Sequence, residues 1–297
     1  MMKLNIRMPA KLMIIWDYDS ALGQINSSFP YNFKYDPIYQ EIENVEYILN
    51  KAEELNIKMT FACLGFAAEN GILPFNNPEQ IKKISDAGHE IASHSWKHEW
   101  FPYLTDRQIY KSLERSKYSL EECTGKKGTV KGFVPPHSRP MSWYKKFSIS
   151  LGDRGFYPLH KGADTGFILK QMSILNYKWC RVIKTFDPVW KKIFKKQNPD
   201  EIIFRKWEIH NGIVCVPQHY TGFDEPAIKH LDNAIELNET LVIVGHPAAL
   251  SRDKSESVKH FNEFMETVKK NILINQLEVF TVTDYINTFM PAGVRKN

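Results

Sequence analysis

The stretch "IKKISDAGHEIASHSWKH", residues 81–98, contains a helix end, a buried strand and two histidines. Gly88 is typical of the residue that follows a helix. Upstream, Asn77 is a typical N-cap, and Pro78 suits the first helical position. The segment "HEIASH", residues 89–94, then predicts a strand that ends at a histidine. The stretch therefore predicts a helix followed by a strand, with polar side chains where the strand ends.

The same alternation of short apolar strands and amphipathic helices continues on both sides and indicates an α/β fold. Asn211-Gly212 suits a type I′ hairpin turn, and Thr105 with Gln108 has capping-box spacing. No strand order can be assigned within residues 139–200. We expect strands at 12–15, 57–65, 89–94, 132–138, 241–247 and 277–281, and helices at 37–55, 77–88, 105–125 and 257–272.

Composition is ordinary for a globular protein with a sizeable core: 297 residues, 43% hydrophobic and 25% charged. The net charge of +5 is spread along the chain, so we expect no nucleic-acid partner. Four cysteines without a CxxC pair predict reduced thiols. The first apolar run, residues 12–15, is too short for a membrane span or a signal-peptide core, and we expect a cytoplasmic protein. The oligomeric state is left open.

Three polar clusters follow predicted strands: Asp17 with Asp19, His94 with His98, and His246. In βα-barrels, active sites assemble at this edge because the βα loops converge there. On a helical turn, His94 and His98 would project from one face. Asp17 and Asp19 would share a face of an extended strand end.

Two imidazoles and one carboxylate make a three-ligand cation site that leaves a position for water. A zinc-like ion lowers the pKa of that water to about 7, so a second carboxylate can act as its base. The residues alone leave alternatives open. His94 and His98 lack the glutamate of a HExxH helix and fit a solvated surface pair equally. Asp17 and Asp19 fit a turn or a helix cap.

Four segments, in this order, resemble the polysaccharide deacetylase family with the NodB homology domain. They are "MTFACLG" (59–65), "AGHEIASHSWKH" (87–98), "GFVPPHS" (132–138) and "VIVGHP" (242–247). The resemblance covers about residues 11–138 and 240–290. It implies a distorted (β/α) barrel of the NodB type, as a single domain over residues 1–297, with 139–200 as an insertion or variable region.

The resemblance also implies roles for individual residues. Asp17 would be the catalytic base and His246 the general acid. Asp19, His94 and His98 would hold one divalent metal ion, Zn²⁺ by preference, with Co²⁺ or Ni²⁺ as alternatives. The substrate-binding residues would be Pro136, His137, Trp96 and Arg139, with a backbone N–H near Pro136–His137 in the oxyanion pocket.

Two departures from the family pattern stand out. Val134 occupies the place of the arginine that pairs with the catalytic aspartate in the family. Arg139 is a candidate replacement, although a surface arginine fits equally well. His137 and Ser138 stand where the family has tyrosine and glycine. The family's carboxylate that orients the acid histidine has no clear counterpart; Asp164 is a candidate, and a turn aspartate is the alternative.

The implied activity is metal-dependent removal of an acetyl group from an N-acetylated sugar or glycan. The expected cytoplasmic location favours intracellular glycan biosynthesis of the O-antigen or capsule type. Two alternatives stay open. One is hydrolysis of another small amide on the same scaffold, and the other is a non-catalytic carbohydrate-binding protein, which the valine at 134 would explain.

Overall fold

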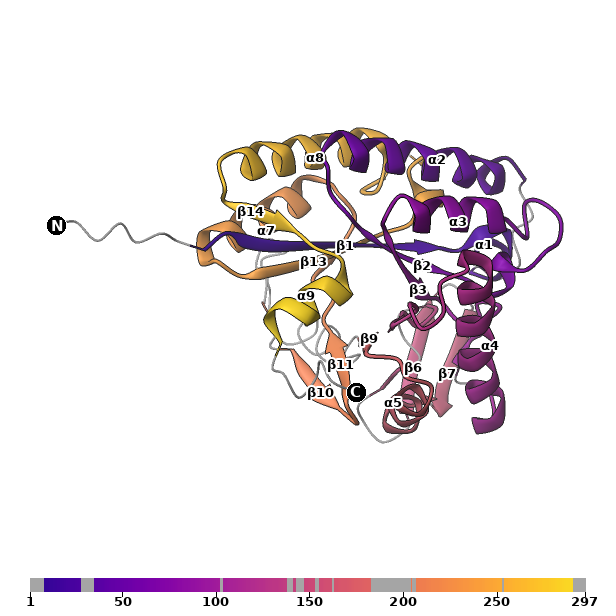
Figure 1. Cartoon of the computed structure of the whole chain (residues 1–297). Helices are drawn as coiled ribbons and strands as arrows, with labels where there is room; N and C mark the ends of the chain where they lie inside the picture. Colours follow the sequence, from indigo (N-terminus) through magenta and orange to yellow (C-terminus); the bar gives the residue numbers. More distant parts are fainter. Residues whose placement is uncertain are drawn as a thin grey trace.

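The centre of the molecule is a curled, mostly parallel sheet (Figure 1). The computed structural model describes residues 8–27, 35–101, 104–137, 141–142, 147–152, 155–161, 163–182, 204, 207–252 and 254–290. The ten strands, in spatial order, are β10 (Glu208–His210), β11 (Ile213–Val216), β9 (Trp179–Arg181), β4 (Gly132–Phe133), β3 (Glu90–Ser93), β2 (Thr60–Cys63), β1 (Ala10–Tyr18), β13 (Thr240–Gly245) and β12 (Tyr220–Thr221), with β14 (Leu277–Val279) beside β1. Among the pairs that the described residues form in this sheet, only β10–β11 is antiparallel.

Helices surround this sheet, and most of them cover its outer face (Figure 1). They are α1 (Ser20–Asn26), α2 (Tyr35–Glu54), α3 (Pro78–Asp86), α4 (Asp106–Thr124), α5 (Thr165–Ile174), α7 (Glu225–Leu237), α8 (Val258–Leu273) and α9 (Val282–Phe289), with short 3-10 turns η1 (Phe66–Ala68) and η3 (Pro247–Ala249). Two small sheets pair β5 (Met141–Ser142) with β8 (Ala163–Asp164) and β6 (Phe147–Gly152) with β7 (Gly155–Lys161). None of the helices in the described part of the chain combines the length and apolarity needed to span a bilayer.

Strand β1 is buried on both faces, as expected for a parallel strand between helices and a barrel interior. Its even-numbered residues face outward. Trp16, for example, packs against Phe261 of α8 and against Phe223, which precedes α7, with ring centroids 5.3 and 5.1 Å away. Met13 and Ile15 face an inner apolar cluster. Because side chains alternate along a strand, Asp17 continues this inner row at the end of β1.

Helix α9 closes the interior at the end where the strands begin. Its Val282 and Ile286 join the inner cluster, and the Thr283 amide donates to Glu90 Oε2 at 3.1 Å. The indole N–H of Trp179 donates to Glu90 Oε1 at 3.0 Å. A closed, hydrogen-bonded floor leaves the opposite end, where the strands stop, for a binding site.

The architecture confirms the predicted distorted barrel, and local signals in the sequence account for several element ends. Asn77 accepts a hydrogen bond from the Gln80 amide at the start of α3, and Thr105 forms a capping box at α4. Asn211 and Gly212 have φ values of 53° and 76°, which suits a type I′ turn. Strand β9 of this sheet, in contrast, lies inside residues 139–200, where the sequence pattern allowed no strand order to be assigned.

Candidate metal centre

Asp17 and Asp19 lie at the end of β1 but in different backbone conformations. Asp17 belongs to the strand, whereas Asp19 has helical angles (φ −73°, ψ −24°) and starts α1. The expectation that both extend from one strand face is therefore wrong for Asp19. Ser20 follows in the left-handed region with φ 53°. This turn ends the strand and brings the Asp19 carboxylate above the end of β3.

The two histidines converge through a bent loop, and the predicted helical turn is wrong. His94 follows β3 directly, and the loop reverses through left-handed backbone at Ser95 (φ 68°) and His98 (φ 56°). Asn26, at the end of α1, donates from its side chain to the His98 carbonyl at 3.3 Å. This hydrogen bond anchors the histidine loop to α1, the helix that follows Asp19.

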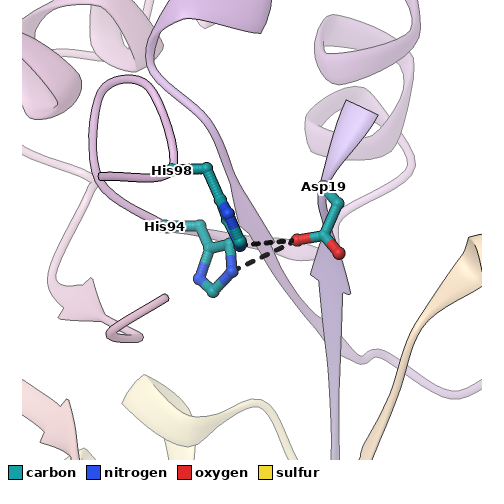
Figure 2. Close-up of side chains that lie close together, drawn as sticks. All are labelled: Asp19, His94 and His98. Carbon is teal, nitrogen blue, oxygen red and sulfur yellow. Dashed lines mark ion pairs between the residues drawn. The ribbon is translucent and has the colours of Figure 1, made fainter. Parts of the chain in front are cut away.

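Asp19, His94 and His98 form a compact donor set (Figure 2). Nε2 of each histidine lies 3.3 Å from Asp19 Oδ1, and all three side chains are almost fully buried. Charge-assisted hydrogen bonds are shorter, about 2.7–2.9 Å. Two ligands about 2.1 Å from a tetrahedral ion lie about 3.4 Å apart. The spacing therefore fits shared coordination of one cation better than direct hydrogen bonds.

The orientation of His94 supports the same interpretation. Its Nδ1 lies 2.8 Å from the carbonyl oxygen of Val134. A carbonyl only accepts hydrogen bonds, so Nδ1 carries a proton and donates it, and Nε2 is the nitrogen that faces Asp19 and would bind a cation. Such outer hydrogen bonds fix the tautomer of metal-binding histidines. Burial raises the pKa of Asp19, but His98 and His94 outweigh it and hold this pKa well below 3.8, so the carboxylate is charged.

Arg181, a residue that sequence reasoning missed, pairs with Asp17. Its guanidinium donates two hydrogen bonds of 2.7 Å, one to each carboxylate oxygen, and both side chains are almost completely buried. Burial raises the pKa of Asp17, but Arg181, with His94 and His246, outweighs burial and lowers this pKa below 3.8. The carboxylate is therefore ionised at neutral pH.

Arg181 fills the place left by Val134 from the neighbouring strand. In the β4–β9 register, Phe133 lies opposite Cys180, so the next step places Val134 beside Arg181. Both residues face the barrel interior. Val134 belongs to the inner cluster, and so does Trp179, which shares a strand face with Arg181. Compared with the family pattern, which has its arginine at the position of Val134, this chain carries the guanidinium on the neighbouring strand β9. Arg139, the candidate replacement, lies outside the described residues.

His246 directly follows β13. Its Nε2 is 3.8 Å from Asp17 Oδ2, and its Nδ1 is 2.9 Å from Glu256 Oε1. Glu256 also accepts a 2.6 Å hydrogen bond from the His246 backbone amide. The carboxylate that orients this histidine is therefore Glu256. Asp164 instead caps α5 by accepting from the Phe167 amide.

Charge around His246 sets its protonation. Burial lowers the pKa of this imidazole, but Glu256, followed by Asp17 and Asp19, outweighs burial and raises the pKa to about 10. His246 is consequently an imidazolium at neutral pH. A cation held beside Asp19 would lower this pKa, because like charges repel.

Replacing Glu256 by glutamine is expected to move the pKa of His246 from about 10 toward 6.5, because the main stabilising charge is removed. NMR titration of the His246 ring in chelator-treated protein measures this shift. A raised pKa contributes stability that is complete below pH 6.5 and is lost as the pH rises toward 10. The variant should therefore show a flatter dependence of unfolding free energy over that range. Glu263→Gln, beside half-buried His260, is the control. An unchanged His246 titration in Glu256→Gln would contradict the assignment.

The expected substrate-binding residues fall into three groups. Pro136 and His137 follow β4, and the His137 ring lies 4.4 Å from the His98 ring, edge to face. Trp96 lies against α4, where Arg115 stacks on its ring at 3.6 Å and Glu69 accepts from the indole N–H. The structure does not bring Trp96 among the cation donors; it lines a separate hollow of about 770 Å³ along α4. Arg139 is not described.

Fold and site together define a parallel α/β barrel with an Asp-His-His candidate cation site at the carboxyl ends of its strands. Residues 32–152 match the family model of the polysaccharide deacetylases. This match confirms the resemblance inferred from the sequence. The matched segment contains both histidines of the candidate cation site, whereas Asp17, Asp19 and His246 lie outside it.

Curated relatives align over short segments. Chitin deacetylase 1 of Saccharomyces cerevisiae is 30% identical over 103 residues, 33% of this chain and 32% of the relative. The peptidoglycan-N-acetylglucosamine deacetylase PgdA of Listeria monocytogenes is 26% identical over 78 residues, 26% of this chain and 16% of the relative. The chain thus spans a third or less of the length of these relatives.

Solved structures match nearly the whole chain. One from Mycobacterium smegmatis, assigned as a polysaccharide deacetylase, has a TM-score of 0.62 at 17% identity and covers 94% of this chain and 89% of its own. The PuuE allantoinase also has a TM-score of 0.62, at 14% identity, covering 97% and 94%. At these identities the similarity shows the fold alone.

Proposed function

We propose that this protein is a metal-dependent hydrolase that removes the acetyl group from an N-acetylated sugar. One observation carries the proposal: the barrel mouth places a three-donor cation site beside an ionised carboxylate, and an imidazolium beside that carboxylate. Amide hydrolysis requires a base for water and an acid for the departing nitrogen. The segment match to the polysaccharide deacetylases and the names of the aligned relatives support an acetamido sugar as substrate.

Asp19, His94 and His98 would hold the divalent ion, for which nitrogen and oxygen donors favour zinc, with cobalt and nickel as alternatives. When bound, such an ion lowers the pKa of its water and polarises a carbonyl oxygen. His94 is prepared for this role by its Nδ1–H bond to Val134.

Asp17 acts as the base. Arg181 occupies one lone pair on each oxygen of this carboxylate, and a carboxylate has about four such positions. Asp17 can therefore still accept a proton from water while its orientation is fixed. The valine at 134 does not argue for lost turnover, because Arg181 restores the buried cation next to Asp17.

His246 acts as the acid. It is protonated at neutral pH and donates its Nε2 proton to the departing amine, while Glu256 holds Nδ1. After turnover, Asp17 holds the proton from water and His246 is neutral. Because the two groups lie 3.8 Å apart, a small approach returns the proton to His246 and resets the site.

The loop after β4 is proposed to contact the substrate. His137 lies against the ring of His98, and its backbone amide is the N–H that follows Pro136. We assign this amide to the oxyanion and the neighbouring side chains to contacts with the sugar. Histidine tolerates the left-handed angle at this position (φ 61°) better than branched residues do.

Metal removal tests the proposal. Purified protein is expected to contain about one zinc per chain, the stoichiometry of a single three-ligand site. It should release acetate from at least one N-acetylated sugar or nucleotide sugar, lose this activity with a chelator, and regain it with zinc. Elemental analysis and an acetate assay over a panel of sugars measure both quantities. Bound metal without acetate release from any sugar would favour the carbohydrate-binding alternative.

A second candidate is hydrolysis of a different small amide. The fold match to an allantoinase extends over 97% of this chain, and the same base, cation site and acid suit any small amide. Adding cyclic and linear small amides to the panel separates the two functions. Turnover of such an amide, with no acetate released from any sugar, would replace the sugar deacetylase assignment.

A further inference from the structure

Helix α2 carries two buried polar side chains on the face that it turns toward the sheet. Glu41 is 1% exposed and Asn44 is 8% exposed. Residues three apart in a helix lie on the same face, one turn from each other. An outer helix that only packs against a sheet would bury apolar side chains here, since an unpaired buried polar group costs free energy. Their partners therefore indicate what they hold.

Glu41 is connected to the segment that carries Asp19. The side-chain amide of Gln24, in α1, donates to Glu41 Oε2 at 2.9 Å. Asp19 starts the same short helix, and the Gly23 amide donates to the Asp19 carbonyl at 2.9 Å. A Cβ at Gly23 would lie only 2.7 Å from the Asp19 Cβ, so α1 and Asp19 are packed without spare room. A displacement of Gln24 would consequently move Asp19.

Asn44 is connected to the segment that carries His246. Its side-chain amide donates to the Pro247 carbonyl at 2.8 Å and to Ser251 Oγ at 2.9 Å. Pro247 is the residue directly after His246 and the first residue of η3. Asn44 thus fixes the chain directly after the imidazole-bearing residue.

We propose that Glu41 and Asn44 are positioning residues, which hold the Asp19 segment and the His246 segment at a fixed separation on one rigid helix. This inference rests on the proposed function, in which Asp19 binds the cation and His246 is the acid. The pairing of β1 with β13 ends at Trp16 and Gly245, before Asp19 and before η3, so the register of these two strands does not extend to either segment. Helix α2 replaces that missing constraint with two side-chain anchors.

The role of Glu41 in positioning Asp19 is tested by measuring the affinity for zinc alone. Glu41→Ala is expected to weaken zinc affinity by about 10–100-fold, the usual effect of removing a partner behind a ligand. Gln24→Ala removes the same hydrogen bond from a half-buried side chain and should weaken zinc binding in the same direction even if Glu41→Ala fails to fold. Glu41→Gln keeps an acceptor for Gln24 and should bind zinc as the wild type does. Glu43→Ala, on the exposed face of α2, is the matched control. Titration against a competing chelator measures the affinities.

The role of Asn44 in positioning His246 is tested by an effect on kcat that leaves zinc affinity unchanged. Asn44→Ala should lower kcat by about 10-fold on the sugar identified by the acetate assay and leave KM and zinc affinity unchanged. Asn44→Asp, which has the same shape, should lose kcat too, because a carboxylate cannot donate to the Pro247 carbonyl. Asn50→Ala, on the exposed side of the same helix, is the control.

The outcomes distinguish this inference from the proposed function. Wild-type zinc affinity in both Glu41→Ala and Gln24→Ala, or an unchanged kcat in Asn44→Ala, overturns the positioning role. Zinc binding without turnover on any substrate overturns the proposed reaction. The zinc affinities of Glu41→Ala and Gln24→Ala still test the positioning role in that case. A wild-type chain that binds no zinc overturns both.

Discussion

Asp17→Asn is expected to lower kcat by about 10²–10⁴-fold while leaving zinc bound, because the amide cannot take a proton from water. Asp17 is not one of the three clustered donors, and its side chain is held by Arg181 rather than by the histidines. Asparagine keeps one acceptor oxygen for the guanidinium. Metal content and initial rates of acetate release, measured on the same preparation, check both parts.

Asp19→Asn provides the contrast for this experiment. The Asp19 carboxylate is the shared partner of both imidazoles, so its loss is expected to remove zinc first and turnover as a consequence. Excess zinc should therefore restore part of the activity of Asp19→Asn and none of that of Asp17→Asn. A zinc-loaded Asp17→Asn protein that turned over at the wild-type rate would exclude Asp17 as the base.

Arg181→Leu is expected to lower the free energy of unfolding by about 3–5 kcal/mol, because breaking a buried ion pair leaves an uncompensated charge. Arg181 and Asp17 are 1% and 4% exposed, so water cannot replace the lost partner. Urea denaturation at pH 7 measures the change. Arg115→Leu breaks an ion pair whose arginine is 52% exposed, and should cost less than about 1 kcal/mol.

The pH dependence of Arg181→Leu gives a second readout with a definite sign. In the wild type, the pKa of Asp17 is lowered below 3.8, so its contribution to stability is present above that pH and is lost as the pH falls through the lowered pKa. Without the guanidinium, burial should raise this pKa. The free energy of unfolding of the variant should then increase toward acid pH. The acid limb of its pH–rate profile should shift to higher pH.

A second substitution tests the displaced arginine directly. Since Val134 lies beside Arg181 in the strand register, Val134→Arg in the Arg181→Leu background should recover part of the lost rate. A denaturation midpoint and acid limb for Arg181→Leu that match those of the wild type would show that Asp17 does not depend on this pair.

Much of the barrel is determined by local signals in the sequence. Gly88, the Asn77 cap and the Thr105 capping box act within a few residues, so they can be recognised without knowing what packs against them. The strands β1, β2, β3 and β13 are short apolar runs between such signals. The residues Asp17, Asp19, His94, His98 and His246 could be named for the same reason, since each follows one of these runs.

The partners of these residues are a different matter. Arg181 lies 164 positions from Asp17 in the chain, in a three-residue strand within a segment that shows no clear pattern. The nearest signal is the pair Trp179 and Arg181, which share one face of that strand, but only the pairing of β9 with β4 shows that the face is inward. Glu256 similarly lies in a loop without a motif.

The sequence by itself determined the order of the elements outside residues 139–200, the end of the barrel that carries the site, and the residue types able to hold a cation and move protons. Only the tertiary structure decided that Asp17 pairs with an arginine from β9, that Glu256 orients His246, and that the two histidines meet through a left-handed loop instead of a helix. The reason is physical. Caps and alternation act over a few residues, whereas a side chain's partner depends on which strands the sheet brings together and on how far each side chain reaches.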